Sequence, residues 1–190
     1  MYKSELREQY KQLRNRLSAD QKKSYDNQLL AHLQQLDWNS CKYVHVFLSI
    51  ASANEPDTSL FIAWMRVAHP SVNIVISKSD FSNGTMQNFL YERDTKLEVN
   101  KWGIPEPVHA VPVEEKKLDV ILLPLLAVDK AGNRVGYGKG FYDRLLQQCR
   151  KDVYTVGLSY FEPVEHIEDI GEWDIPLKCC ISPERIHYFQ

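Results

Sequence analysis

The sequence predicts an α/β fold of three layers, α/β/α, in which helices cover a mostly parallel, Rossmann-like central sheet. Short runs rich in β-branched and apolar residues alternate with segments of helical periodicity, as in chains built from strand–helix–strand units. The run Leu118–Leu123 is almost continuously apolar, which is typical of a parallel strand buried on both faces. A glycine-rich segment, Arg134–Arg144, follows it and leads into a helical pattern. No linker or repeat divides residues 1–190, so a single domain is expected.

Two helices are expected at the N-terminus. The first is predicted over residues 3–17, where apolar residues recur at helical spacing: Leu6, Tyr10, Leu13 and Leu17. Basic residues recur along the same helix and form an edge whose ordinary interpretation is a solvated flank: Lys3, Arg7, Lys11 and Arg14. The second helix is predicted over roughly 19–36, because Ser18 and Gln21 have the spacing of a capping box. Its inward residues are expected to be Leu29, Leu33 and Leu36.

A strand, a loop and a third helix come next. Tyr43–Leu48 is rich in strand-forming residues, and His45 inside it is interpreted as a packed core-edge histidine rather than a catalyst. The following loop leads into a helix with Asp57 or Thr58 as its N-cap and with an expected buried face of Leu60, Phe61, Trp64 and Val67. Loops at the carboxyl ends of strands are where open α/β sheets bind ligands, and this one contains Glu55. The alternative for Glu55 is a carboxylate that interacts with the helix dipole.

The second half of the chain supplies the remaining strands. They are predicted at residues 72–77, at 86–91 after a turn at 82–84, and at 118–123, 154–158 and 178–182. Residues 97–107 are expected to be a structured loop, 111–117 a polar connection, and 161–176 an irregular acidic segment. Trp102 in the first of these either stacks on a flat heterocycle or packs within the loop.

Composition excludes several classes of protein. Lys plus Arg number 23 and Asp plus Glu 25, and a net charge of −2 provides no general field for nucleic acid or anionic membranes. The four cysteines form no Cys-x-x-Cys pair and are interpreted as buried free thiols. The segment Met1–Glu5 is polar, and no apolar run is long enough to span a membrane. We therefore expect a cytoplasmic protein whose anion site, if present, is local.

The glycine-rich segment has the properties of a phosphate site. Gly136, Gly138 and Gly140 remove side chains where a ligand must approach the backbone, and the start of a helix offers free N–H groups to an anion. Arg134 and Lys139 add positive charge, and Asp143 is an oxygen ligand of the kind that Mg²⁺ accepts beside phosphates. Both common nucleotide motifs are excluded, since Gly140 follows Lys139 and Phe141 stands where a dinucleotide fingerprint has glycine. The alternative is a simple turn between a strand and a helix.

These residues resemble the signature of the 5-formyltetrahydrofolate cyclo-ligase family, Arg-Leu-Gly-Tyr-Gly-x-Gly-Tyr-Tyr-Asp-Arg. Val135 and Phe141 are mild departures from it, and family members usually have Pro at Ser77 and commonly Gly at Leu125. Other segments that resemble the family are the Lys-x-x-x-Arg pair near the N-terminus, Glu55-Pro56-Asp57-Thr58, residues 102–107, and Trp173-Asp174-Ile175-Pro176-Leu177.

The resemblance implies roles for individual residues. Arg134 and Lys139 would be catalytic, and Asp143 and Asp174 would hold Mg²⁺. The ATP-binding residues would be Lys3, Arg7, Arg134, Val135, Gly136, Tyr137, Gly138, Lys139, Gly140, Phe141 and Tyr142. The substrate-binding residues would be Ile50, Glu55, Trp102, Tyr137, Gly138, Lys139, Gly140 and Phe141.

The implied reaction is ATP- and Mg²⁺-dependent cyclisation of 5-formyltetrahydrofolate to 5,10-methenyltetrahydrofolate, with release of ADP and phosphate. The expected partners are ATP and the folate, with or without a polyglutamate tail, and the expected state is a monomer with no nucleic-acid or membrane partner. The implied fold type is shared with sugar-phosphate isomerases and CoA transferases, so these remain alternatives. A module that binds a nucleotide without turnover is a further alternative, because fold alone does not determine function.

Overall fold

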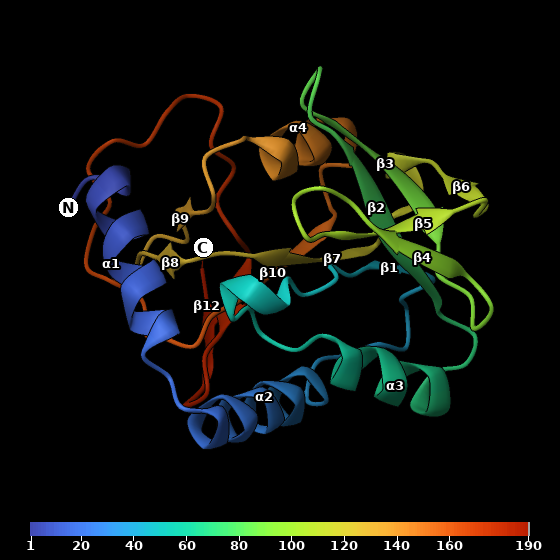
Figure 1. Cartoon of the computed structure of the whole chain (residues 1–190), viewed down its shortest axis with the longest axis horizontal. Helices are drawn as coiled ribbons and strands as arrows, with labels where there is room; N and C mark the ends of the chain where they lie inside the picture. The colour runs from blue at the N-terminus through green and yellow to red at the C-terminus, as the bar shows by residue number, and fades with distance from the viewer. Residues whose placement is uncertain (190) are drawn as a thin grey trace.

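The middle layer of the protein, described here by a computed structural model over residues 1–189, is an eight-stranded sheet (Figure 1). Its strand order is β12-β11-β10-β7-β1-β2-β3-β6. Five neighbouring strands are parallel: β11 (Cys179–Ile181), β10 (Tyr154–Leu158), β7 (Val120–Pro124), β1 (Tyr43–His45) and β2 (Asn73–Asp80). Antiparallel strands complete both edges: β3 (Thr85–Leu90), β6 (Pro112–Val113) and β12 (Ile186–Tyr188). The mostly parallel sheet agrees with the prediction from the sequence.

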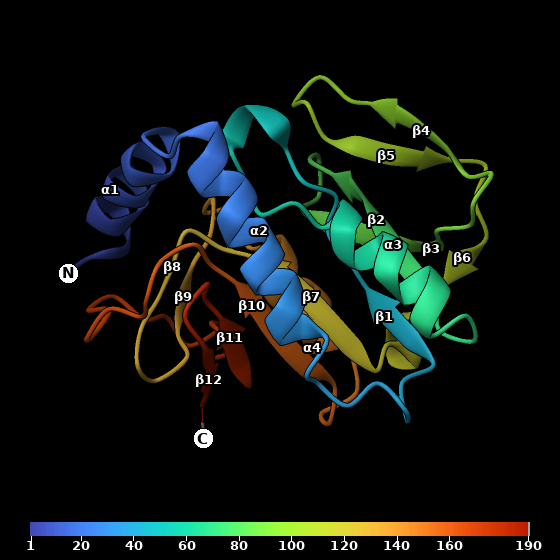
Figure 2. The same cartoon turned by 90° about the horizontal axis from the view of Figure 1, so that it is seen from below.

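Helices cover both faces of this sheet (Figures 1 and 2). One face packs against α2 (Ala19–Leu33) and α3 (Ser59–Ala68), and the other packs against the single short helix α4 (Phe141–Gln148). Side chains alternate along β7, so that Leu122 joins the cluster beneath α2 and α3 while Ile121 and Leu123 join the cluster beneath α4. Because both faces of β7 are buried, its sequence is continuously apolar.

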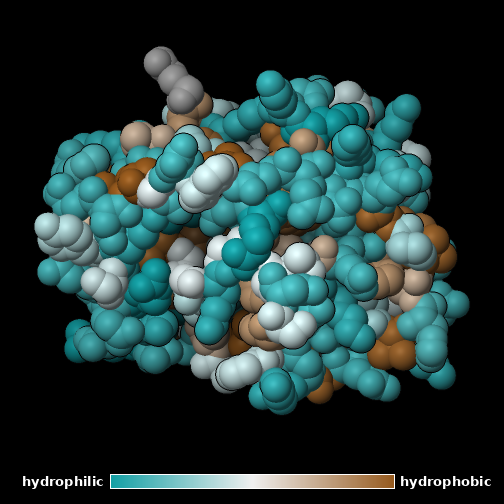
Figure 3. Space-filling model, turned by 90° about the horizontal axis from the view of Figure 1, so that it is seen from above, coloured by the Kyte–Doolittle hydropathy of each residue, from teal (hydrophilic) through white to brown (hydrophobic). Residues whose placement is uncertain are grey.

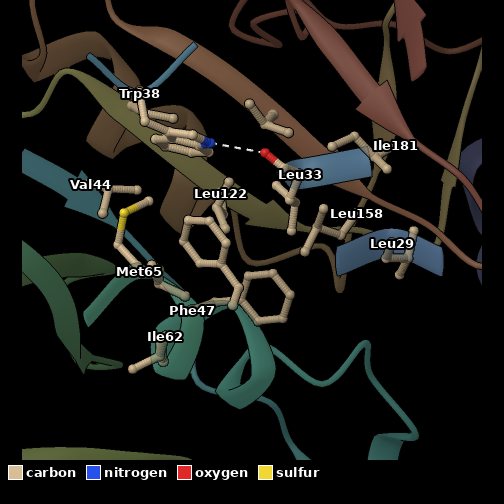
Figure 4. Close-up of a cluster of buried hydrophobic side chains, with 14 of the residues drawn as sticks. Leu29, Leu33, Trp38, Val44, Phe47, Ile62, Met65, Leu122, Leu158 and Ile181 are labelled. Atoms are coloured by element: carbon tan, nitrogen blue, oxygen red, sulfur yellow. Dashed lines mark hydrogen bonds between the residues drawn. The ribbon is translucent and has the colours of Figure 1, made fainter. Parts of the chain in front are cut away.

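The larger core cluster lies between the sheet and the helices α2 and α3 (Figure 4). Its central side chains are Leu33, Trp38, Phe47, Met65 and Leu122, each no more than 6% exposed. The indole of Trp38 donates a hydrogen bond to the carbonyl of Leu33 over 2.9 Å, which satisfies its one polar atom inside the core.

A third cluster joins α1 (Lys3–Asn15) to a small hairpin of β8 (Ala127–Val128) and β9 (Arg134–Val135). Leu6 and Tyr10 of the helix pack against residues of the hairpin, Val135 among them. The hairpin runs directly into the glycine-rich segment. The amphipathic stripe of the first helix therefore anchors the loop that the sequence marks as a ligand site.

The capping box of α2 is confirmed, because Ser18 and Gln21 each accept a hydrogen bond from the other's backbone N–H, over 3.2 and 3.0 Å. The helix ends at Leu33, earlier than the expected residue 36. The buried face predicted for α3 was wrong in one member, since Val67 is 79% exposed. Phe61, Ile62 and Met65 form that face. Val67 lies about 200° around the helix from Met65, because each residue turns the helix by about 100°.

Residues 97–107, expected to be a loop, form a hairpin of β4 (Lys96–Val99) and β5 (Pro105–Val108). All four residues of β4 are exposed, so its sequence lacks the alternation that marks a half-buried strand. The edge strands β6 and β12 were also not predicted, and both are only two or three residues long. Two short 3-10 turns, η1 (Ala51–Ala53) and η2 (Glu115–Lys117), complete the described elements.

Leu125 departs from the glycine that the resemblance implies at this position, and the structure shows how its side chain is accommodated. Its side chain is 1% exposed and lies over Gly157 of β10. A Cβ atom at position 157 would be 2.5 Å from Leu125 Cδ2 and 2.6 Å from Leu177 Cδ1. The absence of a side chain at 157 is therefore a packing requirement.

One face of the molecule is mostly polar (Figure 3). In Figure 3 hydrophilic residues cover most of the face shown, and hydrophobic residues appear in small separate patches. None of the helices in residues 1–189 has the length and apolarity needed to cross a membrane. All four cysteines are free, and Cys41, Cys179 and Cys180 are buried, as expected from their sequence context.

Candidate active site

A cavity of about 680 Å³ opens at the carboxyl ends of the parallel strands. Its wall includes His45 at the end of β1, Ser77 and Ser79 of β2, and Pro124 at the end of β7. This is the edge at which open α/β sheets bind ligands. A cavity of this size is in the range that accommodates a small-molecule substrate.

The cavity brings together nearly all of the predicted site residues. Those that line it are Lys3, Arg7, Ile50, Glu55, Trp102, Arg134, Gly136, Tyr137, Gly138, Lys139, Gly140, Phe141, Tyr142, Asp143 and Asp174. The exception is Val135, whose side chain is 1% exposed and packs against α1. Only the backbone of Val135 is left to take part in a site. Lys3 and Asp174 are separated by most of the chain, yet they meet in this wall.

Four cations line the cavity, and two of them are paired with carboxylates. Arg134 Nη2 donates to Asp143 Oδ1 over 2.6 Å, and Lys3 Nζ donates to Asp174 Oδ2. Arg7 donates from Nε to the carbonyl of Gly136 over 2.9 Å. Lys139 takes part in none of the ion pairs found within residues 1–189. Arg7 and Lys139 therefore present charge that no carboxylate neutralises.

The two carboxylates predicted to hold Mg²⁺ lie in the same wall. Burial alone would raise the pKa of Asp174, but hydrogen bonds from Lys3 and from the backbone of Gly171 leave it below its ordinary value. Asp143 also accepts a hydrogen bond from the backbone N–H of Ile175, over 3.3 Å. Within residues 1–189, no group of three or more His, Cys, Asp or Glu side chains is arranged to hold a metal by itself. An ion at this place would therefore depend on ligand oxygens in addition to the protein.

Glu55 lines the same cavity and is held beside Tyr137 of the glycine-rich segment. Its side chain accepts hydrogen bonds from the N–H of Ile50 over 2.7 Å and from the hydroxyl of Tyr137 over 2.8 Å. Glu55 is 3% exposed, and burial raises its pKa, while the bonds from Ile50 and Tyr137 and the charge of Arg14 act in the opposite direction. These contacts point the carboxylate toward the glycine-rich segment and not toward the start of α3.

Arg14 was missed as a site residue, because its spacing suggested a solvated edge. The structure buries it, with 2% exposure, beneath Tyr137. Its guanidinium donates to the hydroxyl of Tyr137 over 3.1 Å and to the carbonyls of Leu125 and Ala53. The sequence did contain a signal, because Arg14 follows Tyr10 by four residues and therefore shares the buried stripe of α1.

His45 is buried, as its position in a strand predicted, and it also lines the cavity. Burial lowers its pKa to about 4, so the imidazole is neutral near pH 7. Its Nε2 lies 2.6 Å from the hydroxyl of Ser77, which in turn donates to Asn88 over 2.8 Å. The serine at position 77 thus supplies a polar partner for a buried histidine that proline would not supply.

Three aromatic side chains form part of the cavity wall: Phe81, Trp102 and Phe141. Trp102 lies in the turn of the β4–β5 hairpin, is 54% exposed and has its ring 5.2 Å from that of Phe81. Phe81 also meets Phe141 edge-on, with 5.0 Å between ring centres. Phe81 was not predicted as a site residue, because its place beside the glycine-rich segment depends on a long-range contact. Trp102 both packs on Phe81 and keeps about half of its surface free for a ligand.

We expect Arg14→Met to lower the free energy of unfolding by about 3 kcal/mol, because it removes a buried charge that bonds three acceptors and offsets Glu55. Lys11→Met on the same helix is the matched control, with an expected change below about 0.5 kcal/mol, since Lys11 pairs only with Glu8 at the surface. Urea unfolding followed by circular dichroism measures both. Equal effects of the two substitutions would contradict the assignment of Arg14 as a buried structural cation.

Comparison with known proteins supports the resemblance seen in the sequence. The sequence model of the 5-formyltetrahydrofolate cyclo-ligase family matches residues 1–183. The 5-formyltetrahydrofolate cyclo-ligase of Haemophilus influenzae is 28% identical over 183 residues, which cover 92% of this chain and 94% of that protein. The enzyme of the same name from Escherichia coli K12 is 33% identical over 147 residues, covering 75% and 79% of the two chains.

Solved structures agree with the fold. The NMR structure of Aquifex aeolicus 5,10-methenyltetrahydrofolate synthetase has a TM-score of 0.84 and 27% identity, and the match covers 100% of this chain and 94% of that one. The synthetase from Mycoplasma pneumoniae has a TM-score of 0.76 at 24% identity, with 95% and 98% coverage, and supports the fold alone. The match along nearly the whole sequence and the shared architecture place this chain in the 5-formyltetrahydrofolate cyclo-ligase family.

Proposed function

We propose that the protein converts 5-formyltetrahydrofolate to 5,10-methenyltetrahydrofolate with ATP and Mg²⁺, releasing ADP and phosphate. The observation that carries the proposal is one cavity whose lining combines two kinds of groups. Lys3, Arg7 and Lys139 line it together with the glycine-rich segment, and Glu55 and Trp102 line it as well. The first group has the chemistry of a triphosphate site, and the second has a carboxylate and an aromatic ring for a pterin.

The chemistry proceeds in two transfers. The formyl oxygen attacks the γ-phosphorus of ATP, so that an O–P bond forms as the bond to ADP breaks. N10 of the folate then attacks the activated formyl carbon, loses its proton, and phosphate leaves as the C–O bond breaks. Positioning and charge stabilisation account for most catalysis in phosphoryl transfer, so this reaction requires no covalent intermediate with a protein side chain.

Arg134 and Lys139 are proposed to stabilise the negative charge that develops on the transferred phosphoryl group. Arg134 is held for this task, because it bonds to both Asp143 and the carbonyl of Ile175 and its side chain is only 8% exposed. Lys139 is exposed and, within the described chain, free of carboxylate partners, so a phosphate can attract it directly. The backbone N–H groups of Gly136 to Tyr142 are proposed to bind the nucleotide.

Asp143 and Asp174 are proposed to hold Mg²⁺ together with phosphate oxygens. Both side chains are partly exposed toward the cavity, at 24% and 26%. Mg²⁺ takes one or two carboxylates beside phosphates and keeps several waters, so this donor set fits it. The ion would neutralise phosphate charge during transfer.

The alternatives raised by the fold are disfavoured by the family match across residues 1–183. A thermal-shift comparison separates them: Mg·ATP and 5-formyltetrahydrofolate are expected to raise the melting temperature, and ribose 5-phosphate and acetyl-CoA are not. We further propose that the protein acts as a cytoplasmic monomer on free folates, with or without polyglutamate tails. Its net charge of −2 supports the lack of a nucleic-acid partner.

We expect product absorbance in the methenyl band to appear only when ATP, Mg²⁺ and 5-formyltetrahydrofolate are all present. One ADP is expected for each product formed, because the formyl oxygen leaves as phosphate. An ATP analogue with a non-hydrolysable β–γ bridge is the control and gives no product. Product formation with that analogue, or without any nucleotide, would overturn the proposed reaction.

The two groups of cavity residues are expected to respond differently to substitution. Replacing Lys3 and Arg7 together by Gln is expected to raise the KM for ATP by on the order of 100-fold, since a bond to a charged group contributes about 1.5 to 3 kcal/mol. Glu55→Gln is expected to raise the KM for the folate and leave that for ATP within about twofold. Lys11→Gln serves as the control for charge on α1. If Glu55→Gln weakened both substrates equally, its role would be structural.

Asp143→Asn is expected to shift the Mg²⁺ requirement of the reaction upward by about tenfold or more at fixed ATP, because an ionised ligand is replaced by a neutral one. Asp174→Asn is expected to shift it less, since Asp174 is held by Lys3 and Gly171. Titration of activity with Mg²⁺ measures both. An unshifted curve for Asp143→Asn would assign the ion to ATP alone.

A further inference from the structure

One arginine outside the cavity joins two of the segments that form it. Arg144 of α4 donates from Nε to the carbonyl of Gly84 over 2.5 Å and from Nη2 to the carbonyl of Lys139 over 2.5 Å. Gly84 belongs to the turn between β2 and β3, and Lys139 belongs to the glycine-rich segment. Figure 1 shows the tip of the β2–β3 hairpin reaching toward α4. A single guanidinium therefore connects two loops that are distant in sequence.

Both loops are shaped around this guanidinium. A Cβ atom at Gly84 would be 2.4 Å from Arg144 Nη2, and one at Gly140 would be 3.0 Å from Nη1. Both glycines also have a positive φ, +72° and +68°, which disfavours other residues. The same side chain lies over the ring of Phe141, 5.7 Å from its centre. The Arg144 guanidinium thus contacts the β2–β3 turn, the glycine-rich segment and the first residue of α4.

The turn that Arg144 holds carries part of the cavity wall. Phe81 and Met86, on either side of the turn, line the cavity. Phe81 contacts both Trp102, which is proposed to contact the folate, and Phe141, which ends the glycine-rich segment and begins α4. A change in the position of the glycine-rich segment would therefore shift Phe81 directly, through its contact with Phe141.

We propose that Arg144 couples the two substrates, so that a nucleotide bound to the glycine-rich segment favours folate binding by fixing the β2–β3 turn and Phe81. The proposal rests on the function proposed above, because it needs both substrates in one cavity. Arg144 is a positioning residue, since it contacts loop carbonyls and does not line the cavity. Thermodynamic linkage requires the coupling to be reciprocal, so the folate must strengthen nucleotide binding by the same factor.

The test is calorimetric titration of 5-formyltetrahydrofolate with and without a saturating non-hydrolysable ATP analogue and Mg²⁺. We expect the analogue to lower the folate Kd of the natural protein by about fivefold or more. Arg144→Ala is expected to reduce this factor to near one, while the folate Kd without nucleotide changes by less than about threefold. Gly84→Ala provides an independent route to the same loss, because its new Cβ displaces the guanidinium.

Arg150→Ala is the matched control. Arg150 follows the end of the same helix, but it pairs with Asp119 and Asp152 away from the cavity, so the full coupling factor is expected. Coupling that survives in Arg144→Ala, or that is absent from the natural protein although both ligands bind, would overturn the proposal and leave the proposed reaction intact. Failure of the natural protein to bind either ligand would instead remove the proposed function and this inference with it.

Discussion

The site depends on the burial of one positive charge, that of Arg14. A guanidinium taken out of water is costly unless its donors find acceptors and its charge finds a counter-charge. Arg14 finds acceptors for Nη1 and Nη2 where four segments meet: α1, the chain after β7, the η1 turn and Tyr137; its buried Nε has no partner among the described residues. Its counter-charge, Glu55, accepts a hydrogen bond from the same Tyr137 hydroxyl group. Because these bonds require all four segments to be in place, the parts of the cavity wall that they carry form together.

Two further cations of the cavity wall are paired with carboxylates, whereas Arg7 and Lys139 take part in no ion pair found within residues 1–189. Lys3 with Asp174 and Arg134 with Asp143 keep four charges balanced in a partly buried space. In the proposed reaction, phosphates would be attracted to Lys3 and Arg134 as well as to Arg7 and Lys139, and Asp143 and Asp174 would hold Mg²⁺, which would neutralise phosphate charge. The two ion pairs thus keep cations and carboxylates side by side in the wall where both kinds of charge would be used.

Most of the fold could be predicted from the sequence, but fewer of the contacts inside the site could. Continuous apolar runs such as Leu118–Leu123 marked the buried strands, and the Ser18 box marked the start of α2, because both signals are local. Parallel strands share one carboxyl edge, so residues placed after different strands were brought together as expected. The exposed strand β4 has no alternating pattern and was missed. Phe81 and Arg144 take their positions from contacts between distant segments, which spacing along the chain does not encode. The burial of Arg14 was indicated by its helical spacing from Tyr10, but its charge suggested a solvated edge instead.

The packing of Leu125 over Gly157 limits which segments can be exchanged between this protein and a relative in a chimeric protein. Glycine at position 125 would leave empty the space above β10 that the Leu125 side chain fills, and any side chain at position 157 would need part of that same space. A chimera that combined Leu125 with a residue larger than glycine at position 157 would therefore have a steric collision with Leu125 and Leu177. Positions 125 and 157 must for this reason be exchanged together.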